Sequence, residues 1–224
     1  AGFEGSAVAI QKKGGKGKVL WVVSKNEKGA IVAEIPGGKV EEKDVDSKGK
    51  FNSKITALRE AFEEAGITLT EDQLIFLYYT IGGETGYPAH THVTRELEPH
   101  EIQLEHKEKF YALAWSYAYK REVKTIGKDG KEKMENYWYI KTDDVHSKRE
   151  DGELALESDI RNFNRYFLEQ NLPQFAGRGH VVDPELKTIH TTIRNPDVLY
   201  PGAAVAFALV AVIVTFIFNF KNPY

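Results

Sequence analysis

The chain has 224 residues, of which 42% are hydrophobic and 28% are charged, and its formal net charge at pH 7 is −3. This length and composition are typical of one globular domain with an additional element, and the slightly acidic balance disfavours a protein that binds nucleic acid through its overall charge. The sequence contains no cysteine, which excludes disulfides, thiolate catalysis and cysteine metal sites.

The first part of the chain alternates short apolar stretches with turns. The stretches SAVAIQKK (6–13) and KVLWVVSK (18–25) flank a turn rich in glycine and lysine, which predicts a β-hairpin. The stretch AIVAEIP (30–36) predicts a third strand that ends at a Pro-Gly-Gly turn. A helix is predicted over about residues 53–65.

Further strands and a second helix are predicted after residue 70. The stretch QLIFLYYTI (73–81) is apolar and aromatic, and two later apolar stretches flank an Asp-Gly pair at 129–130 that is typical of a hairpin turn. Residues 155–171 have apolar side chains at helical spacing. These elements predict an α+β domain over residues 1–171, followed by an extended, proline-containing connector over 172–201.

A long uncharged segment follows the connector. No charge occurs from Val198 to Phe220, and Thr215 is the only polar side chain within residues 202–218. Seventeen helical residues rise about 25 Å, and the flanking residues extend this to about 33 Å, which matches a bilayer core about 30 Å thick. We predict a transmembrane helix over residues 202–220 in preference to a buried core helix, because the charge-rich remainder offers few apolar neighbours.

The surroundings of this segment predict its placement in a membrane. Tyr200 and Lys221 lie at its two ends, where aromatic and basic side chains contact the interface between lipid and water. Only six residues follow Phe218. We therefore expect a tail-anchored, single-pass integral membrane protein in contact with membrane lipid, although the few flanking charges do not set its orientation.

The helix predicted at 53–65 carries three carboxylates on one side. At about 100° per residue, Glu60, Glu63 and Glu64 lie within about 100° of one another. The predicted packing face, on the opposite side, consists of Ile55, Leu58, Phe62 and Ala65. The ordinary interpretation is a solvated helix face. Two features favour a bound cation instead: Glu60 and Glu64 repel each other at i, i+4, and acids near a helix C-terminus oppose the helix macrodipole.

The chemistry of such a site follows from its ligands. A site made only of oxygen ligands suits a hard ion such as Mg²⁺ or Mn²⁺. Magnesium held by carboxylates typically also binds substrate phosphates. Arg59 lies one helical turn before Glu63 and is therefore placed to hold that carboxylate.

This stretch resembles the Nudix box, G-x5-E-x7-R-E-U-x-E-E-x-G-U, in which U is a bulky apolar residue. The second half of the pattern is met by Arg59, Glu60, Glu63, Glu64, Gly66 and Ile67, with the small Ala61 at the first U. The first half begins at Gly38, after an Ile-Pro-Gly sequence. The predicted strands before and after the helix, and the closing helix, agree with the layout of the family over residues 5–171.

The resemblance implies the Nudix fold, an α/β/α sandwich of mixed sheet and flanking helices. It also implies hydrolysis of a nucleoside diphosphate linked to another moiety. Glu60, Glu63 and Glu64 would bind the divalent cations, Arg59 would orient them, and Glu63, Glu64 and Arg59 would be catalytic. Bound metal would stabilise charge on the pyrophosphate and help to generate the attacking hydroxide.

The loop in front of the helix departs from the family pattern. Gly37, Gly38 and Asp44 form the implied substrate loop, in which the glycines let the backbone turn tightly. Asp44 replaces the family glutamate and is shorter by one methylene. Fourteen residues separate Asp44 from Arg59 instead of seven, an insertion of seven. Because this loop is polar and contains Gly49, we expect it to be exposed, mobile and able to move Asp44 away from the helix carboxylates.

Histidine and aromatic side chains offer further candidate sites. Residues 84–109 contain His90, His92, His100 and His106. Their spacing matches no known transition-metal site, so we interpret this segment as a surface loop. The aromatic side chains with the potential to stack on a nucleobase, in place of an ordinary role in the core or in cross-strand pairs, are Tyr78, Tyr79, Trp115, Tyr117 and Trp138.

Three functions remain open from the sequence. The first is a membrane-anchored Nudix hydrolase that uses Mg²⁺ or Mn²⁺ and acts on a nucleotide-type small molecule. The second is a catalytically reduced Nudix-fold subunit of a membrane protein complex, for example in the respiratory chain of the mitochondrial inner membrane. The loop insertion and the tail anchor favour this second function. The third is a nucleotide-binding regulatory module that keeps the metal site without turnover.

Overall fold

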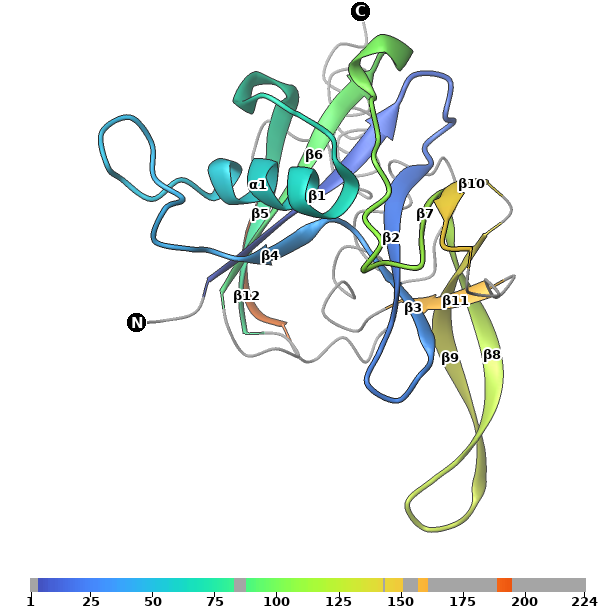
Figure 1. Cartoon of the computed structure of the whole chain (residues 1–224). Coiled ribbons are helices and arrows are strands. Elements are labelled where there is room, and N and C mark those ends of the chain that lie inside the picture. Colours follow the sequence, from blue (N-terminus) through green and yellow to red (C-terminus); the bar gives the residue numbers. More distant parts are fainter. Residues whose placement is uncertain (1–3, 83–87, 143, 151–156, 161–188, 195–224) are drawn as a thin grey trace, which may run out of the picture.

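The computed structural model describes residues 4–82, 88–142, 144–150, 157–160 and 189–194. Within these ranges the chain forms a mixed sheet of twelve strands, one α-helix and two short 3-10 helices (Figure 1). The helices are α1 (Ser53–Ala65), η1 (Glu71–Gln73) and η2 (Pro99–Glu101). The strands are β1 (Gly5–Lys12), β2 (Val19–Lys25), β3 (Ile31–Glu34), β4 (Gly37–Lys39), β5 (Leu74–Gly82), β6 (Ala89–Leu97), β7 (Ala112–Ser116), β8 (Ala118–Ile126), β9 (Glu132–Lys141), β10 (Val145–Lys148), β11 (Glu157–Ile160) and β12 (Ile189–Arg194).

The sheet has two halves that meet where β1 is followed by β2. In one half, β1 runs parallel to β6 and antiparallel to β4, and antiparallel β5 and β12 continue the sheet beyond β6. In the other half, β2 lies between β3 and β7, and β11, β9 and β8 follow β3. β1 and β2 pair only at the end of their hairpin, Gln11 with Val19, so the two halves diverge from that point.

Several predicted elements are confirmed by the structure. The hairpin of β1 and β2, the third strand, the strand near 73–81 and the hairpin of β8 and β9 are all present. Helix α1 has the predicted bounds of 53–65. The Asn52 side chain caps its first turn by accepting a hydrogen bond from the Lys54 N–H, and Gly66 ends it with φ +67°.

Helix α1 packs through a face that agrees only in part with the predicted one. Its buried positions include Ala57, Ala61 and Ala65, spaced by four residues, and the predicted Leu58 packs against the same core, whereas Phe62 is 52% exposed. The helix lies across β1 and β4. Three stacked alanines let a helix approach a sheet closely, and this proximity decides the face more than side-chain hydrophobicity does. Glu64 is drawn to the sheet side with them and is buried.

Two further predictions were wrong. Residues 84–109 are not simply a surface loop, because β6 pairs along both edges, with β1 and β5, and buries Val93. Residues 157–160, predicted as part of a helix, form strand β11 between β3 and β9. Backbone pairing with β3 and β9 stabilises the extended conformation of these residues, although their apolar side chains have helical spacing. The remainder of that predicted helix lies outside the described residues.

The predictions for the C-terminal region fall mainly outside the described ranges. Residues 202–220, together with Tyr200 and Lys221, are not among the residues that the structure describes. Of the predicted connector over 172–201, only β12 is described, and it pairs antiparallel with β5. No helix within the described ranges is long and apolar enough to cross a membrane.

Candidate active site

The C-terminal half of α1 faces the glycine turn at β4, and this contact forms the candidate site. The Gly37 N–H donates a hydrogen bond of 3.0 Å to Oε2 of Glu64. A Cβ atom on Gly38 would collide with the Glu60 carboxylate, and one on Gly37 would collide with Ala7. Gly37 is therefore required for the close approach of β4 to β1, and Gly38 leaves the space that the Glu60 carboxylate occupies.

Arg59 connects the helix carboxylates to one another. Its Nη1 atom lies 2.8 Å from Oε1 of Glu60 and 3.0 Å from Oε2 of Glu63. Its Nη2 atom donates a 2.8 Å hydrogen bond to the Lys39 carbonyl. The predicted contact with Glu63 is present, and Arg59 also fixes the end of β4 against α1.

Asp44 holds Arg59 from the other side. Its two carboxylate oxygens accept hydrogen bonds from Nε and Nη2 of Arg59, at 3.0 and 3.1 Å, and it is 1% exposed. The Thr56 hydroxyl and the Glu41 N–H each donate to Oδ2 at 2.9 Å. Burial opposes ionisation of Asp44, but these hydrogen bonds and the adjacent guanidinium outweigh it, so the pKa of the carboxyl is lowered.

The inserted loop does not move Asp44 away from the helix, contrary to the expectation from the sequence. Val45 and Phe51 pair as an isolated β-bridge, so the loop leaves and returns at one place. Within it, Oδ1 of Asp46 accepts hydrogen bonds from the backbone N–H groups of Lys48 and Lys50. The inserted residues form a loop whose two ends lie side by side. Asp44, just before this loop, therefore keeps its contact with Arg59, which follows it.

The carboxylates of the site interact through their charges. The pKa of Glu64 is raised to about 8, first by burial and then by the charges of Glu34 and Glu60, against the hydrogen bond from Gly37. Burial also raises the pKa of Glu60, and Arg59 opposes this effect. Glu63 differs from both, because its side chain is 42% exposed and also faces the Lys43 ammonium at 3.7 Å. The carboxyl of Glu64 is therefore mostly protonated at neutral pH unless a cation lies beside it.

The carboxylate oxygens of this site are the donors that a hard divalent cation prefers. The three glutamate side chains do not converge on a common point in the structure. No group of three or more His, Asp or Glu side chains in the described part of the chain is arranged to hold a metal ion. Glu60 and Glu63 are instead ion-paired to Arg59. A cation beside Glu64 would offset the cost of burying this carboxylate and the smaller repulsion from Glu34 and Glu60.

Three of the histidines within residues 84–109, His90, His92 and His106, each contact another part of the fold. His92 is fully buried and contacts the Ser53 hydroxyl at 3.3 Å and the Ala7 carbonyl at 3.3 Å. Burial lowers its pKa to about 4. His106 Nε2 lies 2.9 Å from the Phe110 carbonyl. His90 packs against Tyr79.

Of the aromatic residues singled out, Tyr78 and Trp115 are buried in the core. Lys120 lies over the Trp138 ring, and the Tyr117 hydroxyl donates to the Lys16 carbonyl. Tyr79 instead lines a hollow of about 430 Å³ at the start of α1, which we call the α1 N-terminal pocket. Phe51 lines the same pocket and was not among the predicted site residues. The sequence feature that could have indicated it is its position within the loop insertion.

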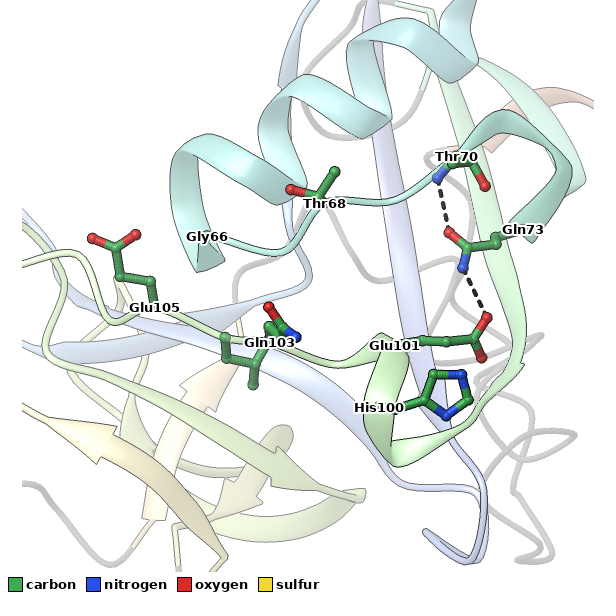
Figure 2. Close-up of a pocket in the computed structure, with 9 residues that line it drawn as sticks. Gly66, Thr68, Thr70, Gln73, His100, Glu101, Gln103 and Glu105 are labelled. Carbon is green, nitrogen blue, oxygen red and sulfur yellow. Dashed lines mark hydrogen bonds between the residues drawn. The ribbon is translucent and has the colours of Figure 1, made fainter.

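A second hollow, of about 520 Å³, lies beyond the C-terminal end of α1 (Figure 2). Gln73 lies between Thr70 and Glu101, accepting from the Thr70 N–H and donating to the Glu101 carboxylate. Glu101 also binds Arg95 and the Glu98 N–H, and together these partners lower its pKa to about 2. The side chains of Gln73 and Glu101 in this hollow are therefore hydrogen-bonded within the protein.

Comparisons with known proteins give weak similarities. No protein-family model matches the sequence, and no curated protein matches it. Among solved structures, a MutT/nudix family protein from Enterococcus faecalis is 12% identical with a TM-score of 0.43, and the match covers 75% of this chain and 60% of that one. A bifunctional NMN adenylyltransferase/ADP ribose pyrophosphatase from Francisella tularensis, complexed with AMP and a Mn ion, is 18% identical with a TM-score of 0.38, covering 52% and 34%. The MutT protein from Methanosarcina mazei is 20% identical with a TM-score of 0.36, covering 50% and 75%.

This chain thus spans 60% of the length of the Enterococcus protein and about a third of the Francisella protein. At TM-scores below 0.5 these similarities support no argument about activity. The assignment of the site depends on the residues and geometry of the chain itself.

Proposed function

We propose that this chain is a Nudix-type hydrolase domain that cleaves a nucleoside diphosphate linked to another moiety and requires Mg²⁺ or Mn²⁺. The single observation that carries this proposal is the contact of Asp44 with Arg59, which persists across an insertion of seven residues. The contact holds Arg59 beside Glu60 and Glu63 and so keeps these two carboxylates adjacent. This arrangement supports a site that binds a metal ion, which the active enzyme requires.

The proposed roles follow from the positions of the side chains. Glu60, Glu63 and Glu64 would hold the cation, which supplies charge stabilisation for the pyrophosphate and lowers the pKa of a water molecule. Arg59 keeps Glu60 and Glu63 adjacent before the cation binds. Asp44 is a positioning residue, because it acts on the carboxylates only through Arg59. The glycine turn brings a backbone N–H to Glu64 and keeps its carboxylate directed towards the site.

Substitution of the buried glutamate tests this proposal. The full chain, purified in detergent, is assayed against a panel of nucleoside diphosphate sugars and dinucleoside polyphosphates with Mg²⁺, with Mn²⁺ and with a chelator. We expect hydrolysis only with the metal, and we expect Glu64→Gln to reduce it to background. Glu122→Gln, on the exposed hairpin, is the matched control and keeps full activity. Absence of hydrolysis by the unaltered chain, or full activity in Glu64→Gln, would refute the proposal.

A second proposal, an accessory subunit of a membrane complex, draws on the hairpin of β8 and β9. This hairpin projects from the rest of the described structure (Figure 1), and it exposes Ile126 by 76% and Met134 by 55%. Apolar side chains at the tip of a projecting element are suited to contact with another protein. Native gel electrophoresis of solubilised membranes tests this: migration of the chain at the mass of a larger assembly supports it, and migration as a single chain contradicts it.

A further inference from the structure

Two aromatic side chains from neighbouring strands form one wall of the α1 N-terminal pocket. Tyr79 of β5 and His90 of β6 are direct cross-strand partners, and their ring centroids lie 4.5 Å apart at an interplanar angle of 43°. The His90 ring also packs against Phe76, at 6.1 Å. Burial lowers the pKa of His90, which keeps its ring neutral at physiological pH. The pocket therefore has an uncharged aromatic wall.

The inserted loop contributes a third ring. Phe51 lines the pocket and is 61% exposed, so folding leaves most of this large apolar side chain in water. Its backbone is held by the bridge to Val45, and the loop is closed by Asp46. A planar ligand that contacted this ring would bury apolar area that the fold alone does not bury.

Polar groups in the same pocket are suited to the edge of a heteroaromatic ring. Lys50, Asn52 and Ser53 line the pocket, and so do the carboxylate residues Glu4 and Asp46. A nucleobase carries donors and acceptors on its edge and a stackable face, and so complements both kinds of group.

The pocket adjoins the carboxylate site along a single strand. Gly38 lies against Glu60, the carbonyl of Lys39 accepts a hydrogen bond from Arg59, and the next residue, Val40, lines the pocket. Two residues of extended chain span about 7 Å. A ligand with its ring in the pocket and its next chemical groups along β4 would extend towards Glu60, which is the order of groups in a nucleoside diphosphate.

From these observations we infer that the α1 N-terminal pocket binds the nucleobase of the substrate, and that the loop insertion supplies Phe51 as a stacking surface for it. The inference rests on the proposed function, since it takes the pyrophosphate to lie at the carboxylates. The pocket volume, about 430 Å³, falls within the ordinary range for small-molecule sites. The insertion, which departs from the Nudix box, thereby acquires a role in substrate recognition.

Binding measurements separate the base from the phosphates. The dissociation constants of ADP and of inorganic pyrophosphate are measured by calorimetry, with Mg²⁺, on the full chain in detergent. We expect Phe51→Ala to weaken ADP binding about 10-fold, as for the loss of one base-stacking contact, and to leave pyrophosphate binding unchanged. Phe51→Trp retains a ring and is expected to restore ADP affinity. Phe62→Ala, which removes another exposed phenylalanine outside the pocket, is the matched control and binds ADP normally.

The other possible outcomes of these binding measurements separate the base pocket from the proposed function. Equal ADP affinity in the unaltered chain and Phe51→Ala overturns the inference, as does equal weakening in Phe62→Ala or failure of the unaltered chain to bind ADP. ADP binding that depends on Phe51 without hydrolysis of any tested substrate upholds the base pocket and refutes the proposed function. If hydrolysis depends on Glu64 and ADP affinity does not change in Phe51→Ala, the proposed function is upheld and the base pocket is refuted.

Discussion

At the scale of single residues, the contact between Asp44 and Arg59 shows that a long loop between two residues can leave their side chains paired. Asp44 is one methylene shorter than the expected glutamate and follows Gly38 at the expected spacing. It nevertheless reaches Arg59 with both oxygens, because the glycine turn brings β4 close to α1. The shorter side chain is compensated by the position of the backbone.

Removal of the Asp44 charge should destabilise the fold. Asp44 is 1% exposed and the Arg59 side chain 11%, and Asp44→Asn removes the most buried of the carboxylates that face this guanidinium, with Glu60 and Glu63 remaining. We expect a loss of about 2 kcal/mol in the free energy of unfolding, measured by urea denaturation, with a larger loss in hydrolysis. Asp129→Asn, in an exposed turn, is the control and should change stability by less than about 0.5 kcal/mol. A stable Asp44→Asn variant would show that the ion pair is not structural.

His92 should make stability depend on pH. Burial lowers its pKa from 6.5 to about 4 in the folded chain, with the Ala7 carbonyl opposing the shift. Between these two values the unfolded chain binds a proton that the folded chain does not bind. Stability is therefore lost as the pH falls from 6.5 towards 4, by about 3 kcal/mol at the lower limit. His92→Gln should show a shallower loss over the same range when both are unfolded in urea. Parallel curves would contradict this assignment.

At the scale of elements, α1 shows the difference between periodicity and packing. Helical spacing predicted Ile55, Leu58, Phe62 and Ala65 on the inner face. In the structure Ala65 is buried together with Ala57 and Ala61, and Phe62 is half exposed. Close approach to β1 and β4 requires small side chains on that face, and the same rotation carries Glu64 to the glycine turn. The position of the carboxylates depends on this rotation.

Enlargement of the alanine face should disturb the helix more than truncation of the exposed one. Ala61 is fully buried, so Ala61→Leu overpacks the contact with the sheet and should cost about 1–3 kcal/mol. Phe62→Ala, at the next residue and half exposed, should change stability by no more than about 0.5 kcal/mol. Thermal unfolding of both variants distinguishes the two faces. The opposite order of effects would restore the packing face predicted from the sequence.

At the scale of the whole molecule, the catalytic proposal and the membrane proposal concern different parts of the chain. The carboxylates and both hollows lie within residues 4–142, whereas the predicted membrane segment at 202–220 is outside the described residues. The prediction of the anchor therefore depends on the absence of charge over Val198–Phe220 and on the length of that segment. We propose that it crosses a membrane once.

Extraction from membranes tests this proposal. The full chain, expressed in cells, should remain in the membrane pellet after alkaline carbonate treatment and should dissolve only in detergent, because a span of about 20 apolar residues is not displaced by charge repulsion. Removal of residues 202–220 should release the chain into the soluble fraction. A full chain that dissolves in carbonate would exclude an integral anchor. Fractionation of organelles then tests the proposed location in the mitochondrial inner membrane.

The sequence by itself determined the features that depend on neighbouring residues. The turn residues at 129–130 and the residues that limit α1 are local features, and so the predicted hairpin and the predicted bounds of α1 were correct. The grouping of Arg59, Glu60 and Glu63 was also predictable, because residues one helical turn apart lie side by side.

Only the tertiary structure decided the features that depend on distant partners. The rotation of α1 depends on the distance to β1 and β4, the strand at 157–160 depends on hydrogen bonds with β3 and β9, and the burial of His92 depends on the strands beside it. The role of the insertion is the clearest case. A polar loop with a central glycine predicts mobility when it is considered alone, yet its two ends are joined at Val45 and Phe51, and this closure keeps Asp44 under Arg59 while presenting Phe51 to the pocket.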